Sequence, residues 1–157
     1  MKIFSLLTCL LIANTFESCS KKEGSATTQP TKTDNISTGT WKYDSGGIDQ
    51  DRNGTIDIPL PSSILEPCKI DNTLKFDKGG TGVTNEGASK CLSTDPQTTT
   101  FNWNFADAEA NLVISGNVYA LLNSKFKIVT LNSTTFSLSR DTVLSGQTLP
   151  LLVNLKH

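Results

Sequence analysis

Stretches in which every second residue is apolar recur along most of this chain, and they constrain its fold more than any other feature. Successive side chains of a β-strand point to opposite faces, so each stretch predicts a strand with one buried face and one face toward water. The pattern covers residues 39–43, 72–77, 101–105, 112–114, 125–128, 136–139 and 149–155. Half-buried strands of this kind are typical of antiparallel sheets.

Turn-forming segments separate these stretches, at residues 78–80, 106–109, 132–133 and 146–147. Short turns join strands that follow each other in the sequence, which indicates an up-and-down meander. About eight strands favour closure, because an open sheet would leave two exposed edges. We therefore predict an all-β fold, an antiparallel up-and-down meander of about eight strands that closes into a barrel. One helical turn is expected at residues 61–65.

The N-terminal part of the chain has a different character. Residues 3–13 are mostly apolar, which suits the core of an export signal and is shorter than the roughly 20 residues that a membrane-spanning helix needs. The sequence F-E-S-C at residues 16–19 resembles the lipobox of bacterial lipoproteins, in the relaxed form of Bacteroidetes-type lipoproteins. We interpret residues 1–18 as a removable signal peptide and Cys19 as the lipidated first residue of the mature protein. The alternative is an ordinary cleaved signal that leaves Cys19 as a free thiol.

Residues 19–37 contain almost no side chain that could be buried, so we expect the lipidated cysteine to be followed by a flexible tether. The barrel domain is expected over residues 38–157. No other segment is long and apolar enough to cross a membrane. We expect the protein in the cell envelope, attached through the lipid on Cys19 to the outer membrane, on either its periplasmic or its external face.

The four cysteines divide into two groups. Cys9 leaves with the signal peptide, and Cys19 carries lipid. Cys68 and Cys91 remain in a compartment where disulfides persist, so we predict a bond between them. The rival interpretation, a two-cysteine metal site, lacks further ligands because the only histidine is the C-terminal His157.

Three segments of the barrel domain resemble a known family. Residues 68–76 run from a cysteine through a polar Asp-Asn turn to a strand that ends in Phe, and residues 86–91 read Glu-Gly-Ala-Ser-Lys-Cys. Residues 39–41, Gly-Thr-Trp, resemble the Gly-x-Trp opening of lipocalins. Together they resemble the lipocalin-like domains of Bacteroidetes-type lipoproteins, over residues 38–157. The resemblance implies a lipocalin-like barrel whose tryptophan closes one end, and it implies no established activity.

Residues 49–57 read D-x-D-x-N-G-x-I-D, which is similar to the first nine positions of a calcium loop of the EF-hand kind. Clustered oxygens suit a hard cation, and the glycine allows a sharp turn. The predicted ligands are Asp49, Asp51, Asn53, the Thr55 carbonyl and Asp57. The loop departs from the pattern at position 12, where Leu60 replaces a bidentate Glu, and it lacks flanking amphipathic helices. The alternative is a polar loop in which Asn53-Gly54 makes a tight turn.

The aromatic residues expected inside the barrel are Trp41, Phe76, Phe101, Trp103 and Phe136. A barrel of about eight strands is either filled by side chains or holds one small ligand, so these residues line a ligand cavity or fill the interior. We favour a lipid-anchored, non-catalytic binding module of the bacterial envelope, for a small apolar ligand. The alternative is a structural or accessory surface lipoprotein with a packed barrel and a calcium-ordered loop, whose protein partner is unknown.

The composition argues against other classes of protein. The net charge is −1, from 14 basic and 15 acidic residues, and no basic patch stands out, so nucleic acid is not an expected partner. A single terminal histidine leaves no Ser/His/Asp set, so we predict that the protein is not an enzyme. Apart from calcium, no cofactor is expected.

Overall fold

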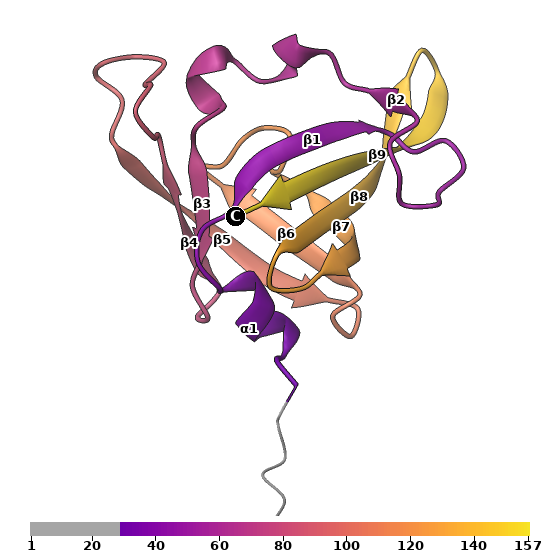
Figure 1. The fold of residues 1–157 in the computed structure, drawn as a ribbon, viewed down its shortest axis with the longest axis horizontal. Coiled ribbons are helices and arrows are strands. Elements are labelled where there is room, and N and C mark those ends of the chain that lie inside the picture. Colours follow the sequence, from indigo (N-terminus) through magenta and orange to yellow (C-terminus); the bar gives the residue numbers. More distant parts are fainter. Residues whose placement is uncertain (1–28) are drawn as a thin grey trace, which may run out of the picture.

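The computed structural model describes residues 29–157. Within these residues, nine strands form a single antiparallel sheet that curls into a barrel, with one short helix at its N-terminal end (Figure 1). The helix is α1 (Lys32–Ile36), and the strands are β1 (Lys42–Ile48), β2 (Ile58–Pro59), β3 (Thr73–Phe76), β4 (Thr81–Asn85), β5 (Thr98–Ala106), β6 (Asn111–Gly116), β7 (Lys125–Leu131), β8 (Thr135–Leu144) and β9 (Gln147–Lys156). Two 3-10 turns, η1 (Ser62–Ile64) and η2 (Pro67–Lys69), lie between β2 and β3.

The strands are arranged as the predicted meander. Their order in the sheet is β2-β1-β9-β8-β7-β6-β5-β4-β3, so β3 to β8 each pair with the next strand of the sequence, and β9 pairs with β1. The two ends of the sheet meet at a single bridge, where Trp41 N donates to Leu74 O at 2.7 Å and Leu74 N donates to Trp41 O at 2.8 Å. The all-β meander is therefore confirmed, with a ninth short strand and with closure by one bridge in place of a full ladder. The helical turn expected at residues 61–65 corresponds to η1.

The interior is filled by the residues that the alternating pattern places inward. In β5, Phe101 and Trp103 are buried while Asn102 and Asn104 face solvent. Removal of such large apolar side chains from water stabilises a fold by roughly 1.5–3 kcal/mol each. The largest side chains that are fully buried are Trp41, Phe76, Phe101, Phe126, Phe136, Ile36, Leu74, Leu112, Ile114, Leu122, Leu138 and Leu152.

Helix α1 closes one end of the barrel, which we call the floor, together with Trp41 and His157. Thr31 caps the helix, because its hydroxyl accepts from Asp34 N at 3.1 Å while the Asp34 carboxylate accepts from Thr31 N at 3.1 Å. Ile36 is completely buried, and its carbonyl accepts from Trp41 Nε1 at 2.8 Å.

The capped helix corrects the predicted boundary between tether and barrel. The fold begins at Thr31 and not at residue 38, because the capping box and the burial of Ile36 fix a segment whose composition alone looks like linker. The predicted signal peptide, Cys19 and the first part of the predicted tether lie in residues 1–28, outside the described residues. No helix among the described residues is long and apolar enough to cross a membrane.

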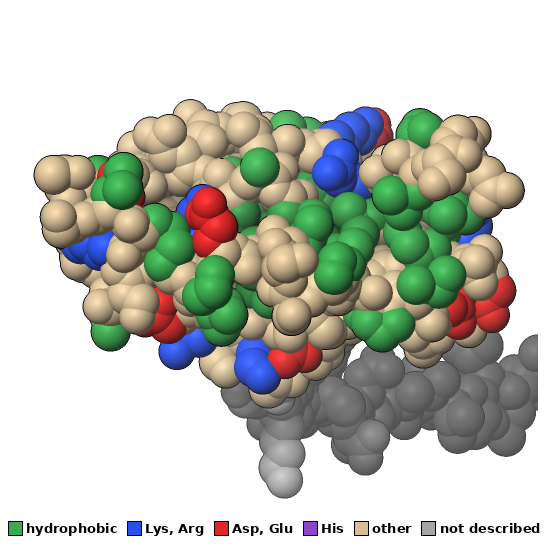
Figure 2. All heavy atoms as spheres, turned by 90° about the horizontal axis from the view of Figure 1, so that it is seen from above, with side chains coloured by type: hydrophobic (Ala, Val, Ile, Leu, Met, Phe, Trp, Pro, Cys, Tyr) green, Lys and Arg blue, Asp and Glu red, His purple; other side chains and the backbone are tan. Residues whose placement is uncertain are grey.

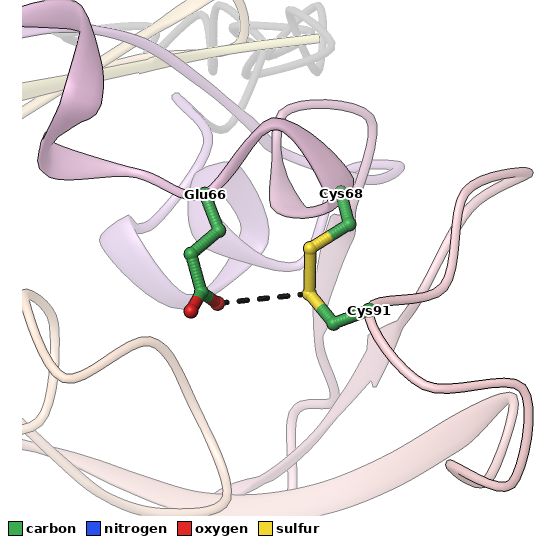
Figure 3. Close-up of side chains that lie close together, drawn as sticks. All are labelled: Glu66, Cys68 and Cys91. Carbon is green, nitrogen blue, oxygen red and sulfur yellow. Dashed lines mark hydrogen bonds between the residues drawn. A yellow bond between two sulfur atoms is a disulfide. The ribbon is translucent and has the colours of Figure 1, made fainter.

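Three segments gather at the other end of the barrel, which we call the mouth: residues 59–72, the β4–β5 loop at residues 86–97, and residues 117–124 after β6 (Figure 1). The disulfide between Cys68 and Cys91 joins η2 to the β4–β5 loop, with 5.1 Å between the two Cα atoms. The predicted bond is therefore confirmed. In Figure 3, Glu66 Oε2 lies 3.6 Å from Cys91 Sγ, and because a disulfide sulfur carries no proton we regard this as a packing contact. Sulfurs bonded to each other provide no thiolate for a metal.

Candidate binding sites at the barrel mouth

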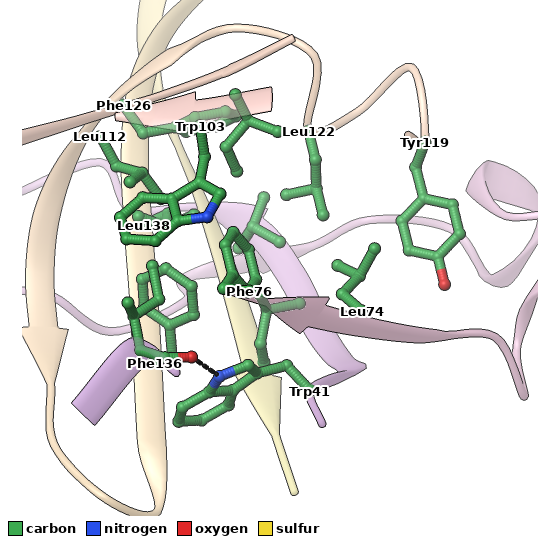
Figure 4. Close-up of a cluster of buried hydrophobic side chains, with 14 of the residues drawn as sticks. Trp41, Leu74, Phe76, Trp103, Leu112, Tyr119, Leu122, Phe126, Phe136 and Leu138 are labelled. Atoms are coloured by element: carbon green, nitrogen blue, oxygen red, sulfur yellow. Dashed lines mark hydrogen bonds between the residues drawn. The ribbon is translucent and has the colours of Figure 1, made fainter. Parts of the chain in front are cut away.

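The aromatic residues predicted to line a ligand cavity pack against one another. Phe76 lies at the centre of the group, with its ring edge-to-face to Phe101, Trp103 and Phe136 at centroid distances of 5.2, 5.7 and 5.9 Å. Trp41 contacts Phe136 in the same manner at 5.3 Å. Figure 4 shows the rings of Trp41, Phe76, Trp103 and Phe136 among aliphatic side chains. Each of these four rings and that of Phe101 is at most 5% exposed. The arrangement favours the alternative in which these side chains fill the interior.

Open space lies instead at the mouth. A solvent-open cavity of about 330 Å³ is bordered by the end of β4, the start of β5, η2 and the segment after β6. This volume is at the lower end of the range for small-molecule sites, roughly 300–1,000 Å³. Its polar walls are formed by Lys69, Asn72, Thr84, Glu86, Asp95, Thr99, Asn117 and Tyr119, and its apolar walls by Pro96, Val118 and Ala120.

Two side chains of this cavity hold buried polar atoms without a partner among the described residues. Asn72 is 1% exposed and its Oδ1 accepts no hydrogen bond, while Tyr119 is 6% exposed and its hydroxyl makes none. Figure 4 shows Tyr119 at the edge of the buried cluster, apart from the other aromatic rings. An unpaired buried polar group costs roughly 1–3 kcal/mol, and two such groups belong to side chains that line this one cavity.

The electrostatic environment of the cavity is mildly acidic. Glu86 and Asp95 line it, and the ammonium of Lys69 is paired with Glu66 at 2.6 Å. Burial raises the pKa of the Tyr119 hydroxyl, and the charges of Glu86 and Asp71 raise it further. The hydroxyl therefore keeps its proton at physiological pH and is able to donate a hydrogen bond.

The cavity walls are fixed by local contacts. Gly87 has a φ of 65°, and a Cβ at this position would lie 2.6 Å from the Asp71 carboxylate, so the turn requires glycine. The Asp71 carboxylate accepts from Ala88 N at 2.7 Å. Across the cavity, the hydroxyls of Thr84 and Thr99 both donate to Asn117 O at 3.2 Å, which fixes the segment that carries Tyr119.

Sequence reasoning missed these cavity residues, although one signal was present. Asn72 continues the inward alternation of Leu74 and Phe76, so it is a polar residue at an inward position of a predicted strand. A polar side chain at such a position needs a buried partner, which marks a place to search for a site. Tyr119 gives no comparable signal, because it lies between strands and depends on contacts made across the sheet.

Residues 49–57, which we call the acidic loop, join β1 to β2 and bring their carboxylates together. Oxygens of Asp49, Asp51 and Asp57 lie within 4.8 Å of one another. Asp49 is 3% exposed, and its two oxygens accept from Asn53 N at 3.0 Å and from Gly54 N at 2.9 Å. Backbone amides thus orient the carboxylate that would occupy the first calcium position.

Two other predicted ligands of this loop also accept hydrogen bonds from neighbouring backbone. Asn53 Oδ1 accepts from Thr55 N at 2.8 Å, and Asp57 Oδ2 accepts from Gln50 N at 2.6 Å. Gly54 has a φ of 87°, so the tight Asn-Gly turn is present as well as the convergence of oxygens. Leu60, at the position of the missing Glu, is half-buried against the core. The loop has the shape of a cation site with an incomplete ligand set.

Comparisons with known proteins add little to what the geometry of the two sites shows. No protein-family model matches the chain, and no curated protein sequence matches it. Among solved structures, the chain is similar to Japanin from Rhipicephalus appendiculatus bound to cholesterol, with a TM-score of 0.45 and 15% sequence identity over 76% of this chain and 75% of that chain. We draw nothing about the ligand of this chain from a similarity at that TM-score.

Proposed function

We propose that this protein is a lipid-anchored, non-catalytic, lipocalin-like binding module of the bacterial envelope, and that it holds a small ligand at the mouth of the barrel. The observation that carries the proposal is the mouth cavity of about 330 Å³ with the buried, unpaired groups of Asn72 and Tyr119. The aromatic interior is filled, so the ligand is expected beside the loops and not along the barrel axis. The lining also indicates a more polar ligand than the apolar one expected from the sequence.

The position of α1 supports an anchored orientation. The chain enters the barrel at the floor, so a lipid on Cys19 would leave the mouth turned away from the membrane. The eleven residues between Cys19 and Thr31 span at most about 40 Å when fully extended. In a bacterial host, we expect the full chain in the outer-membrane fraction with a diacylglyceryl-modified Cys19 detected by mass spectrometry. A Cys19→Ala variant that remained in the membrane fraction would contradict the anchor.

A non-catalytic role is supported by the place of the single histidine. The His157 ring stacks on Trp41 at a centroid distance of 3.9 Å, and its Nδ1 lies 2.7 Å from Thr40 O. The ring is thus part of the floor, at the opposite end of the barrel from the mouth cavity. It has no carboxylate or hydroxyl nucleophile as its hydrogen-bond partner among the described residues.

Ligand binding at the mouth is testable without knowing the ligand. We expect a small-molecule extract of bacterial envelopes to shift amide resonances of the ¹⁵N-labelled chain in residues 84–99 and 117–120. Resonances of α1 provide the internal control, because the helix lies at the floor. An extract that shifts no cavity resonance, or shifts both ends of the barrel equally, would count against the proposed function.

The second candidate function is a surface or accessory lipoprotein with a calcium-ordered loop. It is favoured by the converging oxygens of Asp49, Asp51 and Asp57, and by a groove beside the mouth whose apolar wall includes Leu60, Pro61, Ile64, Leu65 and Ile70. Figure 2 shows the molecule from the mouth side, with apolar side chains gathered across the middle of this face. A large exposed apolar patch often marks a surface for another protein.

Calcium binding by the acidic loop is expected to raise the thermal midpoint of unfolding. Extracellular calcium modules bind at about 10⁻⁴–10⁻³ M, and a ligand at 10 times its Kd stabilises a fold by about 1.4 kcal/mol. We expect a rise of several degrees in millimolar calcium, reversal by a chelator, and loss of the rise in Asp51→Ala. The matched control is Asp44→Ala, an exposed aspartate that pairs with Lys156 outside the loop. An unchanged midpoint with calcium would leave residues 49–57 as a polar Asn-Gly turn.

A further inference from the structure

The walls of the mouth cavity combine two kinds of surface. Amide, hydroxyl and carboxylate groups come from Asn72, Thr99, Tyr119 and Glu86, whereas C–H surface comes from Pro96 and Val118. Building on the proposed function, we propose that the ligand is a small neutral carbohydrate, a mono- or disaccharide. Its hydroxyl groups would pair with the polar wall and its C–H faces would contact the apolar one.

The hydrogen-bonding inventory favours hydroxyl groups on the ligand. A hydroxyl both donates and accepts, so it can serve an acceptor-only carboxylate such as Glu86, the mixed amide of Asn72, and the Tyr119 hydroxyl. Within residues 29–157, neither Asn72 Oδ1 nor the Tyr119 hydroxyl has a hydrogen-bond partner, and an apolar ligand would leave both atoms unpaired. It would also bury Glu86 against hydrocarbon, which is unfavourable for a charged group.

Charge argues against ionic ligands. An anion would face Glu86 and Asp95, and the cation that could receive it, Lys69, is already paired with Glu66. An organic cation would be attracted by Glu86 and Asp95, but an ammonium only donates hydrogen bonds and would leave the proton of the Tyr119 hydroxyl without an acceptor. The Asp95 carboxylate is in addition engaged by Leu92 N at 3.1 Å. A neutral ligand with many hydroxyls avoids both conflicts.

The cavity is held in shape before any ligand binds. The disulfide joins η2, which ends at Lys69, to the loop that carries Asp95 and Pro96. Gln97 Nε2 donates to Asn85 Oδ1 at 3.0 Å and to Gly87 O at 2.8 Å, which closes the two ends of that loop on each other. Fixed walls reduce the ordering cost of binding, which matters for a small ligand that makes few contacts.

The test is an NMR titration of the full chain, ¹⁵N-labelled and kept in a detergent without a sugar headgroup. The probes are glucose, galactose and N-acetylglucosamine, each raised to about 10 mM to cover millimolar affinity, with putrescine and laurate as ligands of other classes. We expect at least one sugar to shift resonances on both walls, in residues 84–99 and 117–120. Neither putrescine nor laurate should do so.

Two variants distinguish a binding role from a structural one. Tyr119→Phe should weaken the sugar affinity at least fivefold while the thermal midpoint of the free protein stays equal or rises, because the hydroxyl has no partner in the free protein. Glu86→Gln, at a half-buried side chain of the cavity wall, should weaken it as well and covers the case in which the first variant fails to fold. The matched control is Tyr43→Phe, since Tyr43 is the only other tyrosine and lies outside the cavity.

The outcomes separate the two proposals. Laurate or putrescine shifting the cavity resonances while sugars do not would overturn the carbohydrate assignment and leave the proposed ligand-binding function standing. If neither the probes nor the envelope extract shift any cavity resonance, both the carbohydrate assignment and the proposed ligand-binding function are overturned. Sugar affinity that falls equally in Tyr43→Phe and Tyr119→Phe would also overturn the assignment, because the effect would not come from the cavity.

Discussion

The floor and the mouth of this barrel differ in the side chains that they bury. At the floor, aromatic rings pack on one another, and the ring N–H of Trp41 reaches the Ile36 carbonyl. At the mouth, Asn72 Oδ1 and the Tyr119 hydroxyl are buried without a hydrogen-bond partner among residues 29–157. The floor is not free of such groups, since Ser37 Oγ is also unpaired, but there it stands alone and lines none of the cavities described above.

The two ends of the barrel are therefore stabilised by different interactions. The floor is held by burial of apolar surface, which needs no other molecule. The mouth is held by a covalent cross-link between Cys68 and Cys91 and by hydrogen bonds within its loops, and it retains unsatisfied polar groups. We therefore assign stability mainly to the floor and recognition mainly to the mouth, and substitutions at the two ends should separate them.

The largest effect is expected at the floor. Phe136→Ala removes a fully buried ring that contacts both Trp41 and Phe76. Substitutions of this kind lower the free energy of unfolding by about 3–5 kcal/mol, which urea denaturation measures. The control is Val143→Ala, at a side chain that is 69% exposed, where the change should stay within about 0.5 kcal/mol. A similar loss in both variants would remove the basis for calling the floor the stable end.

The disulfide tests the mouth. Replacement of Cys68 and Cys91 by serine frees a loop of sequence separation 23, and should lower the free energy of unfolding by about 3 kcal/mol. Amide exchange should rise most in residues 86–97, while α1 stays protected, because the cross-link fixes the mouth and not the floor. Faster exchange of α1 to the same extent would show that the two ends are coupled.

Much of the barrel was predictable from the sequence, because the alternation of apolar and polar residues is a local pattern. Phe101 and Trp103 face inward as the period of two required, and the Cys68–Cys91 bond followed from the absence of other partners after export. Helix α1 was missed because Ile36 is the only apolar residue of a short polar segment, and its burial depends on Trp41, a contact that no local pattern contains.

The candidate site was less predictable, for a related reason. The acidic loop could be located because its residues are contiguous, and the structure does bring Asp49, Asp51 and Asp57 together. The mouth cavity unites residues from η2, β4, β5 and the segment after β6, so only the strand register assembles it. Tyr119 in particular is placed by two threonine hydroxyls on different strands.

The smallest effect is expected at the exposed ion pair between Asp34 of α1 and Lys78 at the floor. The hydrogen bond from Lys78 lowers the pKa of the Asp34 carboxyl from 3.8 to about 2, and the Thr31 hydroxyl and backbone contribute in the same direction. A pKa that is lower in the folded state means that the ionised carboxylate supports the fold above pH 3.8, and that this support is lost as the pH falls toward 2. Acid should therefore loosen α1 while the disulfide keeps the mouth closed.

The measurement is an NMR titration of the Asp34 side-chain carboxyl carbon, in the unmodified chain and in Lys78→Met. The variant removes the largest cause of the shift, so the Asp34 pKa should move back toward 3.8. Asp107 provides the control, because its pKa is lowered by Lys125 and Asn111, which the variant leaves in place. An Asp34 carboxyl that already titrates near 3.8 in the unmodified chain would mean that the Asp34–Lys78 pair does not hold α1 to the floor. The helix would then depend on the contact of Ile36 with Trp41 and on the bond from Lys32 Nζ to Glu109 O.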